Sequence, residues 1–155
     1  MSISFGTVTR ENWEDALRLQ VRPEQMKFAP SVAESLASAY IKPWDEALDP
    51  YVIYANDQLV GFFYISYTPN SKDNYWIGGF IIDRKFQGRG YGRDALQKML
   101  SFIPTEYPQC QEIKLTVERD NSAAQKLYQS VGFNSSGKAN KYDEIIYTYS
   151  VRNTD

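Results

Sequence analysis

Three glycines stand at alternate positions in the stretch FQGRGYG (residues 86–92), between an apolar run and a segment with helical periodicity. Glycine costs about 0.5–1 kcal/mol relative to alanine within regular structure, so the three indicate a backbone that bends sharply or lies close to a ligand. A strand, a glycine turn and a helix together present backbone N–H groups and a positive helix end to an anion. The stretch therefore predicts a site for a phosphate-bearing ligand.

Two common phosphate-binding motifs do not fit this stretch. A Walker loop requires Gly-Lys followed by Ser or Thr, whereas this chain has Gly92-Arg93-Asp94. The dinucleotide fingerprint places glycines at positions one, three and six, whereas Gly88, Gly90 and Gly92 stand at one, three and five. The spacing therefore favours neither a Walker-type nucleotide loop nor a Rossmann dinucleotide site.

The composition narrows the chemistry further. The chain has 155 residues, no histidine and a single cysteine, Cys110. The absence of histidine excludes a Ser-His-Asp triad, a Cys-His pair and every imidazole metal site, and one cysteine excludes a disulfide framework. No metal is therefore expected, and carboxylates, tyrosines, lysines and backbone groups remain as candidate catalytic groups.

Size, charge and hydropathy predict one soluble domain over residues 1–155. The apolar share is 43%, no apolar run approaches the roughly 20 residues of a membrane span, and the start has no secretory signal. These features predict a cytoplasmic protein without a membrane partner. The net charge of −2 gives no support for nucleic-acid binding. Residues 1–60 carry nine acidic and five basic residues, which suits a cationic ligand.

Hydrophobic periodicity predicts an α/β fold, with a mixed, mainly antiparallel sheet of six or seven strands and about four helices. Helices are expected from Thr9 up to Pro23, over 31–40, from the glycines up to Pro104, and over 121–133. Strands are expected at 2–5, 51–55, 59–67, 75–83, 112–117 and 142–151. The order strand, helix, strand after residue 75 predicts a parallel crossover.

The glycine stretch also matches a family signature. Residues 87–92, QGRGYG, have the pattern Gln/Arg-x-x-Gly-x-Gly/Ala before an amphipathic helix, and ERDNSAAQKLYQSVGF follows further along the chain. In this order and on matching elements, the two stretches resemble the GNAT superfamily of N-acetyltransferases, whose element order the whole chain fits. The segments VRPEQMKFAPSVAESLASAY and LVGFFYIS resemble bacterial spermine/spermidine (diamine) N-acetyltransferases of this family.

This resemblance implies acetyl-CoA as the cofactor and a small-molecule amine as the acceptor, on either side of a splayed pair of central strands. It implies that the loop holds the pyrophosphate and that the strand edge at 80–82 pairs with the pantetheine arm. It also implies that Tyr128 is catalytic and donates to the departing sulfur. The cofactor-binding residues implied in this way are Phe80, Ile81, Ile82, Gln87, Gly88, Arg89, Gly90, Tyr91, Gly92, Arg93 and Asn121.

The proton acceptor stays unassigned. Acetyl transfer requires a neutral amine, and an alkylamine with a pKa of about 10.4 is almost wholly protonated at pH 7. The family commonly has a carboxylate in or beside the strand before the loop, where this chain has Gly78 and Gly79. This glycine pair is expected to widen the acceptor groove or to mark a bulge. Candidate bases by residue type are Glu118, Glu24, Glu34 and, through water, Tyr75.

The acceptor is expected to be a polyamine or a similar small primary amine, held by acidic and aromatic side chains. The expected substrate-binding residues are Glu24, Glu34, Gly78 and Gly79. An aminoglycoside, an amino acid and a protein N-terminus remain alternatives, because each presents an amine to the same groove. A domain that binds acyl-CoA without turnover is an alternative of a different class. Exposed sheet edges are compatible with a homodimer.

Overall fold

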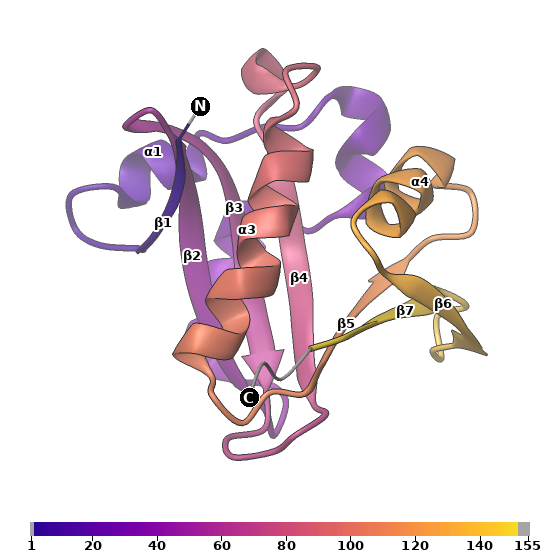
Figure 1. Cartoon of the computed structure of the whole chain (residues 1–155). Helices are drawn as coiled ribbons and strands as arrows, with labels where there is room; N and C mark the ends of the chain where they lie inside the picture. The colour runs from indigo at the N-terminus through magenta and orange to yellow at the C-terminus, as the bar shows by residue number, and fades with distance from the viewer. Residues whose placement is uncertain (1, 152–155) are drawn as a thin grey trace.

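The computed structural model describes residues 2–151, which form one seven-stranded sheet with helices on both faces (Figure 1). The strands are β1 (Ile3–Thr7), β2 (Ala47–Ala55), β3 (Gln58–Tyr67), β4 (Tyr75–Ile82), β5 (Glu112–Val117), β6 (Asn134–Ala139) and β7 (Ile145–Ser150). The helices are α1 (Trp13–Leu17), α2 (Val32–Ile41), α3 (Tyr91–Glu106) and α4 (Ser122–Ser130), with 3₁₀-helices η1 (Pro23–Phe28) and η2 (Arg84–Phe86).

The strand order is β1-β2-β3-β4-β5-β7-β6. β4 and β5 pair in parallel, and the other neighbouring strands pair in antiparallel fashion. A parallel pair needs a crossover connection, which α3 supplies between β4 and β5. The mixed, mainly antiparallel sheet, its helices and its parallel crossover confirm the predicted fold class.

Alternation along the central strands divides the core between the two faces of the sheet. Phe62 and Ile81 belong to a cluster with buried residues of α1 and α2. Their chain neighbours Phe63 and Ile82 belong to a second cluster with the buried residues of α3, against which Leu127 of α4 also packs. Because successive strand residues point to opposite faces, α1 and α2 cover one face while α3 and α4 cover the other.

β4 and β5 diverge along their length. Among the described residues, the two strands pair only at Trp76 and Lys114, near their amino ends. Figure 1 shows β4 and β5 separating beyond that point, with α4 above the opening. The predicted splay of the central strands is therefore confirmed.

β4 carries a bulge at its centre. Phe62 of β3 pairs with Ile81, and Tyr64 pairs with Gly78, so two residues of β4 lie opposite one residue of β3. The first of these two, Gly79, has a φ of +59°, a conformation that glycine adopts without strain. The bulge predicted from the glycine pair is therefore confirmed.

Two predicted helix boundaries are wrong. α1 covers only Trp13–Leu17; its end residues are 44% and 40% exposed, and Ala16 is its buried residue in the core. α3 continues past Pro104 to Glu106, because proline removes one N–H donor while the amide of Tyr107 still bonds to the carbonyl of Ile103 at 2.8 Å. No helix within residues 2–151 is both long and apolar enough to cross a bilayer.

Besides the short η2, two elements have no counterpart among the predicted ones. η1 follows Arg22 and fills part of the segment between α1 and α2, which the sequence left as a connection. β6 has the sequence NSSGKA, and all six residues are exposed. Because β6 lies at the sheet edge and buries neither face, it lacks the alternation that marks a strand.

A buried carboxylate anchors the end of β4. Asp83 is 4% exposed, and its two oxygens accept hydrogen bonds from the backbone N–H groups of Gln20 and Lys85, each at 2.9 Å. The N–H of Arg84 donates to the carbonyl of Gln20 at 2.7 Å. These bonds tie the approach to the glycine loop to the segment after α1.

We expect Asp83→Ala to lower the free energy of unfolding by about 2 kcal/mol, because two backbone N–H groups lose a carboxylate acceptor. Urea unfolding followed by circular dichroism measures this change. Asp120→Ala is the matched control, since Asp120 is 66% exposed and pairs with Lys27 at the surface, where an ion pair contributes less than about 1 kcal/mol. Equal losses in the two variants would contradict an anchoring role for Asp83.

Candidate functional site

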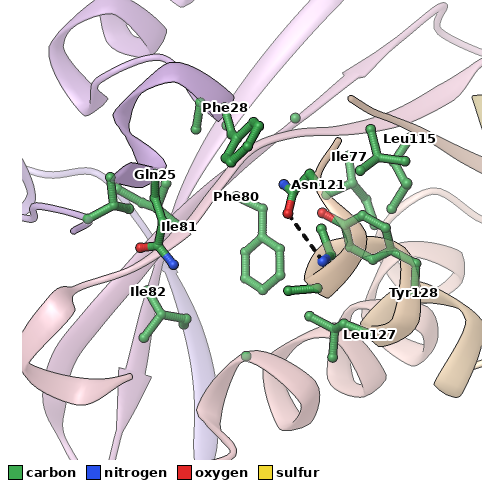
Figure 2. A pocket seen from close by; sticks show the side chains of 18 of the residues that line it. Gln25, Phe28, Ile77, Phe80, Ile81, Ile82, Leu115, Asn121, Leu127 and Tyr128 are labelled. Carbon is green, nitrogen blue, oxygen red and sulfur yellow. Dashed lines mark hydrogen bonds between the residues drawn. The ribbon is translucent and has the colours of Figure 1, made fainter. Parts of the chain in front are cut away.

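A cavity of about 500 Å³ opens where β4 and β5 diverge. Its walls come from η1 and the loop after it, β4, the glycine loop with the start of α3, the end of β5, and α4. Figure 2 shows Gln25 and Phe28 on one side, Leu127 and Tyr128 on the other, and Phe80 between them. Segments far apart in the sequence therefore meet around one space.

Most of the predicted site residues line this cavity. Twelve of them do so: Gly78, Gly79, Phe80, Ile81, Ile82, Gln87, Gly88, Gly90, Tyr91, Gly92, Asn121 and Tyr128. Arg89 and Arg93 are exposed and lie outside the lining. The guanidinium of Arg89 lies 5.7 Å from the ring centre of Phe86, which does line the cavity, so Arg89 stands at the rim.

The glycine loop presents open backbone to the cavity. Gly88 and Gly90 have φ values of +79° and +83°, and a Cβ built on either would meet no heavy atom within 4 Å. Gly90 is the N-cap of α3, a helix of 16 residues whose first amides have no partner within the helix. The helix dipole adds positive potential at the same end. The loop therefore has both the space and the donors to hold a diphosphate.

Gln87 and Asn121 use their side chains to hold the cavity walls. Nε2 of Gln87 donates to Oε1 of Gln25 at 2.9 Å and to the carbonyl of Ile82 at 2.8 Å, which joins η1 to the end of β4. Oδ1 of Asn121 accepts from the N–H of Ala124 at 3.3 Å and caps α4, as the dashed line in Figure 2 shows. Both residues therefore position other lining groups.

Three of the four candidate bases lie away from the cavity lining. Glu24 is exposed on η1. The carboxylate of Glu34 accepts from Ser31 Oγ at 3.2 Å in a capping box at the start of α2. Tyr75 is buried, and its hydroxyl donates to the carbonyl of Ser71 at 2.8 Å. The structure does not bring these three groups to the cavity.

Glu118 does line the cavity, and a second carboxyl group stands beside it. Val117 pairs with Ile145 in the antiparallel ladder of β5 and β7, which makes Glu118 and Glu144 the next opposed residues. Both line the cavity, and Asn140 Nδ2 donates to Glu144 Oε1 at 2.7 Å. Burial raises the pKa of Glu118, and the neighbouring Glu144 raises it further. Glu118 is therefore a stronger base than an ordinary carboxylate.

Tyr128 extends from α4 into the cavity (Figure 2). Its ring packs against Phe133 and Tyr147, with ring centres 6.1 Å and 6.5 Å away. Burial, and then the charge of Glu118, raise the pKa of Tyr128 to about 12. The phenol therefore keeps its proton at neutral pH and acts as a hydrogen-bond donor.

Phe28, Tyr64 and Glu144 are among the lining side chains that sequence reasoning missed. Glu144 becomes a neighbour of Glu118 through strand pairing, and Phe28 arrives on the unpredicted η1. Tyr64 reaches across from β3, where a Cβ built on Gly78 would overlap its hydroxyl. The glycine pair, which was expected to widen the groove or mark a bulge, was the local signal at this position, but it did not identify Tyr64.

Comparisons with known sequences agree with this site. The sequence profile of the acetyltransferase (GNAT) family matches residues 13–133. The chain is 30% identical over 147 residues to spermine/spermidine N(1)-acetyltransferase of Bacillus subtilis (strain 168), which covers 89% of this chain and 91% of that protein. It is 35% identical over 88 residues to the N-alpha-acetyltransferase RimI of Mycobacterium tuberculosis, covering 56% of this chain and 52% of that one.

Solved structures share the fold. Spermidine N-acetyltransferase from Vibrio cholerae, in complex with CoA and spermine, superposes with a TM-score of 0.74 at 18% identity, covering 96% of this chain and 95% of that one. The aminoglycoside acetyltransferase AAC(6')-Ib, in complex with coenzyme A, gives 0.77 at 14% identity, with coverage of 96% and 95%. These matches confirm the predicted family: the chain belongs to the GNAT family of acetyltransferases, as an N-acetyltransferase that uses acetyl-CoA.

Proposed function

We propose that this N-acetyltransferase acetylates a primary amine of a polyamine such as spermidine or spermine. The observation that carries the proposal is the cavity itself, which joins an open anion-binding loop to two carboxyl groups through the gap between β4 and β5. The 30% identity to the B. subtilis spermine/spermidine enzyme, over 89% of this chain, supports the acceptor class.

On the donor side, the proposal assigns the binding of acetyl-CoA mainly to backbone groups. The amides at the start of α3 would hold the diphosphate, and Arg89 at the rim would add positive charge. The edge of β4 near Phe80 lies beside the gap, where an extended pantetheine arm can pair with it as a strand would. Acetyl-CoA supplies an acetyl group activated as a thioester at this gap.

Glu118, supported by Glu144, is the proton acceptor in this proposal. The amine must lose a proton to Glu118, directly or through water, before its nitrogen can bond to the acetyl carbon. The raised pKa of Glu118 improves its strength as a base. The base then comes from the end of β5, which compensates for the missing acid at Gly78.

Tyr128 acts on the leaving group. As the N–C bond forms and the C–S bond breaks, negative charge develops on sulfur, and the phenol can stabilise it with a hydrogen bond. Complete proton transfer from a phenol with a pKa of about 12 to a thiolate with a reference pKa of about 8.5 is uphill by about 5 kcal/mol. Tyr128 therefore contributes chiefly as a hydrogen-bond donor.

The acceptor half of the cavity suits a cation. Glu118 and Glu144 supply negative charge, while Phe28 and Tyr64 supply aromatic faces for cation–π and methylene contacts. An aminoglycoside is the second candidate, because it also presents several ammonium groups and the aminoglycoside enzyme shares the fold at a TM-score of 0.77. A flexible polyamine is favoured because the sequence relative that spans most of the chain carries that name.

An amine panel tests the proposed acceptor. With acetyl-CoA and thiol release as the readout, we expect kcat/KM for spermidine or spermine to exceed that for an aminoglycoside, free amino acids and a peptide N-terminus by at least about tenfold. A higher kcat/KM for the aminoglycoside than for spermidine and spermine would identify the aminoglycoside as the acceptor. Absence of thiol release with every amine would contradict the proposed activity.

The loop assignment predicts the effect of Gly90→Val. A β-branched residue strains a backbone at a φ of +83° and fills the space over the loop, so we expect the Kd for coenzyme A to rise by about tenfold or more. Isothermal titration calorimetry measures it. Gly137→Val is the matched control, because Gly137 has a φ of +77°, equally open surroundings and a place on β6. An unchanged Kd for coenzyme A in Gly90→Val would show that the glycine loop does not bind coenzyme A.

The base assignment predicts a pH dependence. Only the deprotonated carboxylate accepts a proton, so kcat at saturating amine should fall as the pH decreases through the pKa of Glu118, which lies above the usual 4.5. We expect Glu118→Gln to lower kcat by about 100-fold and to abolish this fall, the acidic limb of the pH profile, with an unchanged Kd for coenzyme A. An acidic limb that persists in Glu118→Gln would assign the base elsewhere.

A further inference from the structure

The glycine pair of β4 makes room for a tyrosine of the neighbouring strand. Tyr64 pairs with Gly78 across β3 and β4, and a Cβ built on Gly78 would overlap Cζ, Cε1 and the hydroxyl of Tyr64. A Cβ built on Gly79 would lie 2.9 Å from Cδ2 and Cε2 of the same ring. The ring therefore lies across both glycines, with its hydroxyl end over Gly78.

Tyr64 and Tyr128 lie on opposite faces of the sheet, and both line the cavity together with Glu118 and Glu144. Tyr64 packs against the cluster under α1 and α2, whereas Tyr128 packs against the cluster under α3 and α4. The charge of Glu144 raises the pKa of Tyr64, after burial, and the charge of Glu118 raises that of Tyr128. All four side chains line the cavity between β4 and β5.

Tyr64 lines the cavity from the face of the sheet that α1 and α2 cover. The side chain is half-buried, and within residues 2–151 its hydroxyl makes no hydrogen bond, so it can donate to or accept from a ligand. Phe28 of η1 lines the same cavity and adds a second aromatic side chain. An acidic side chain on Gly78 would project into the space that the Tyr64 ring fills.

We propose that Tyr64 binds the acceptor amine in place of the side chain that Gly78 lacks. Its hydroxyl oxygen accepts a hydrogen bond from the amine N–H, and its ring covers the adjoining methylene groups. The nitrogen is thereby held while its proton passes to Glu118. This inference rests on the proposed function, since it assigns a contact of the same acceptor site.

Tyr64→Phe tests the hydroxyl and keeps the ring. With the preferred amine of the panel, we expect KM to rise and kcat/KM to fall by about tenfold, while the Kd for coenzyme A stays unchanged. Tyr149→Phe is the matched control, because Tyr149 packs on Phe133 at 5.6 Å and lies outside the cavity lining. Unchanged amine kinetics in Tyr64→Phe, with an active wild type, would overturn the inference and leave the proposed function intact.

A second experiment removes the tyrosine from β3 and places a polar side chain on β4 instead. Tyr64→Ala empties the space over Gly78, so Gly78→Glu can then be added in that background, with Gly78→Met as an apolar side chain of similar length. We expect kcat/KM to be at least about tenfold higher in Tyr64→Ala with Gly78→Glu than in Tyr64→Ala alone. Adding Gly78→Met should leave kcat/KM at the value of Tyr64→Ala. Equal activity of the two double variants would reduce Tyr64 to a space-filling residue and overturn its assignment.

Discussion

The single point of pairing between β4 and β5 is the constraint on which the rest of the site depends. Hydrogen bonding near Trp76 and Lys114 holds the two strands in one sheet, and their divergence beyond it opens the cavity. Backbone N–H and C=O groups require partners when buried, so a sheet can open in this way only where water or a ligand supplies them. The opening therefore leaves backbone groups of β4 and β5 available to water or to a ligand.

The bulge in β4 determines which residues face this opening. Ile77 packs with the cluster under α3, whereas Ile81 packs with the cluster under α1 and α2, although a regular strand would place both on one face. The extra residue at Gly79 shifts the alternation and directs Phe80 toward the cavity. Asp83 then fixes the strand end from which the glycine loop departs.

Features encoded within a few neighbouring residues were predictable from the sequence. The positive φ values at Gly88 and Gly90 and the capping box at Ser31 and Glu34 belong to this class, because each depends on local geometry. Glu118 and Glu144 lie side by side because of the register of β5 and β7, which no local sequence pattern reveals. β6 buries neither face, so its sequence has no alternation from which a strand could be predicted. The predicted homodimer is a property of two chains and stays a prediction.

The contact between Tyr64 and Gly78 also constrains how such a site can arise. The ring and any larger side chain at position 78 exclude each other, so substitutions at the two positions are not independent. A lineage with an acid at position 78 would have to lose it before a tyrosine could settle at position 64. Passage between the two arrangements therefore runs through an intermediate in which neither side chain occupies this part of the cavity wall.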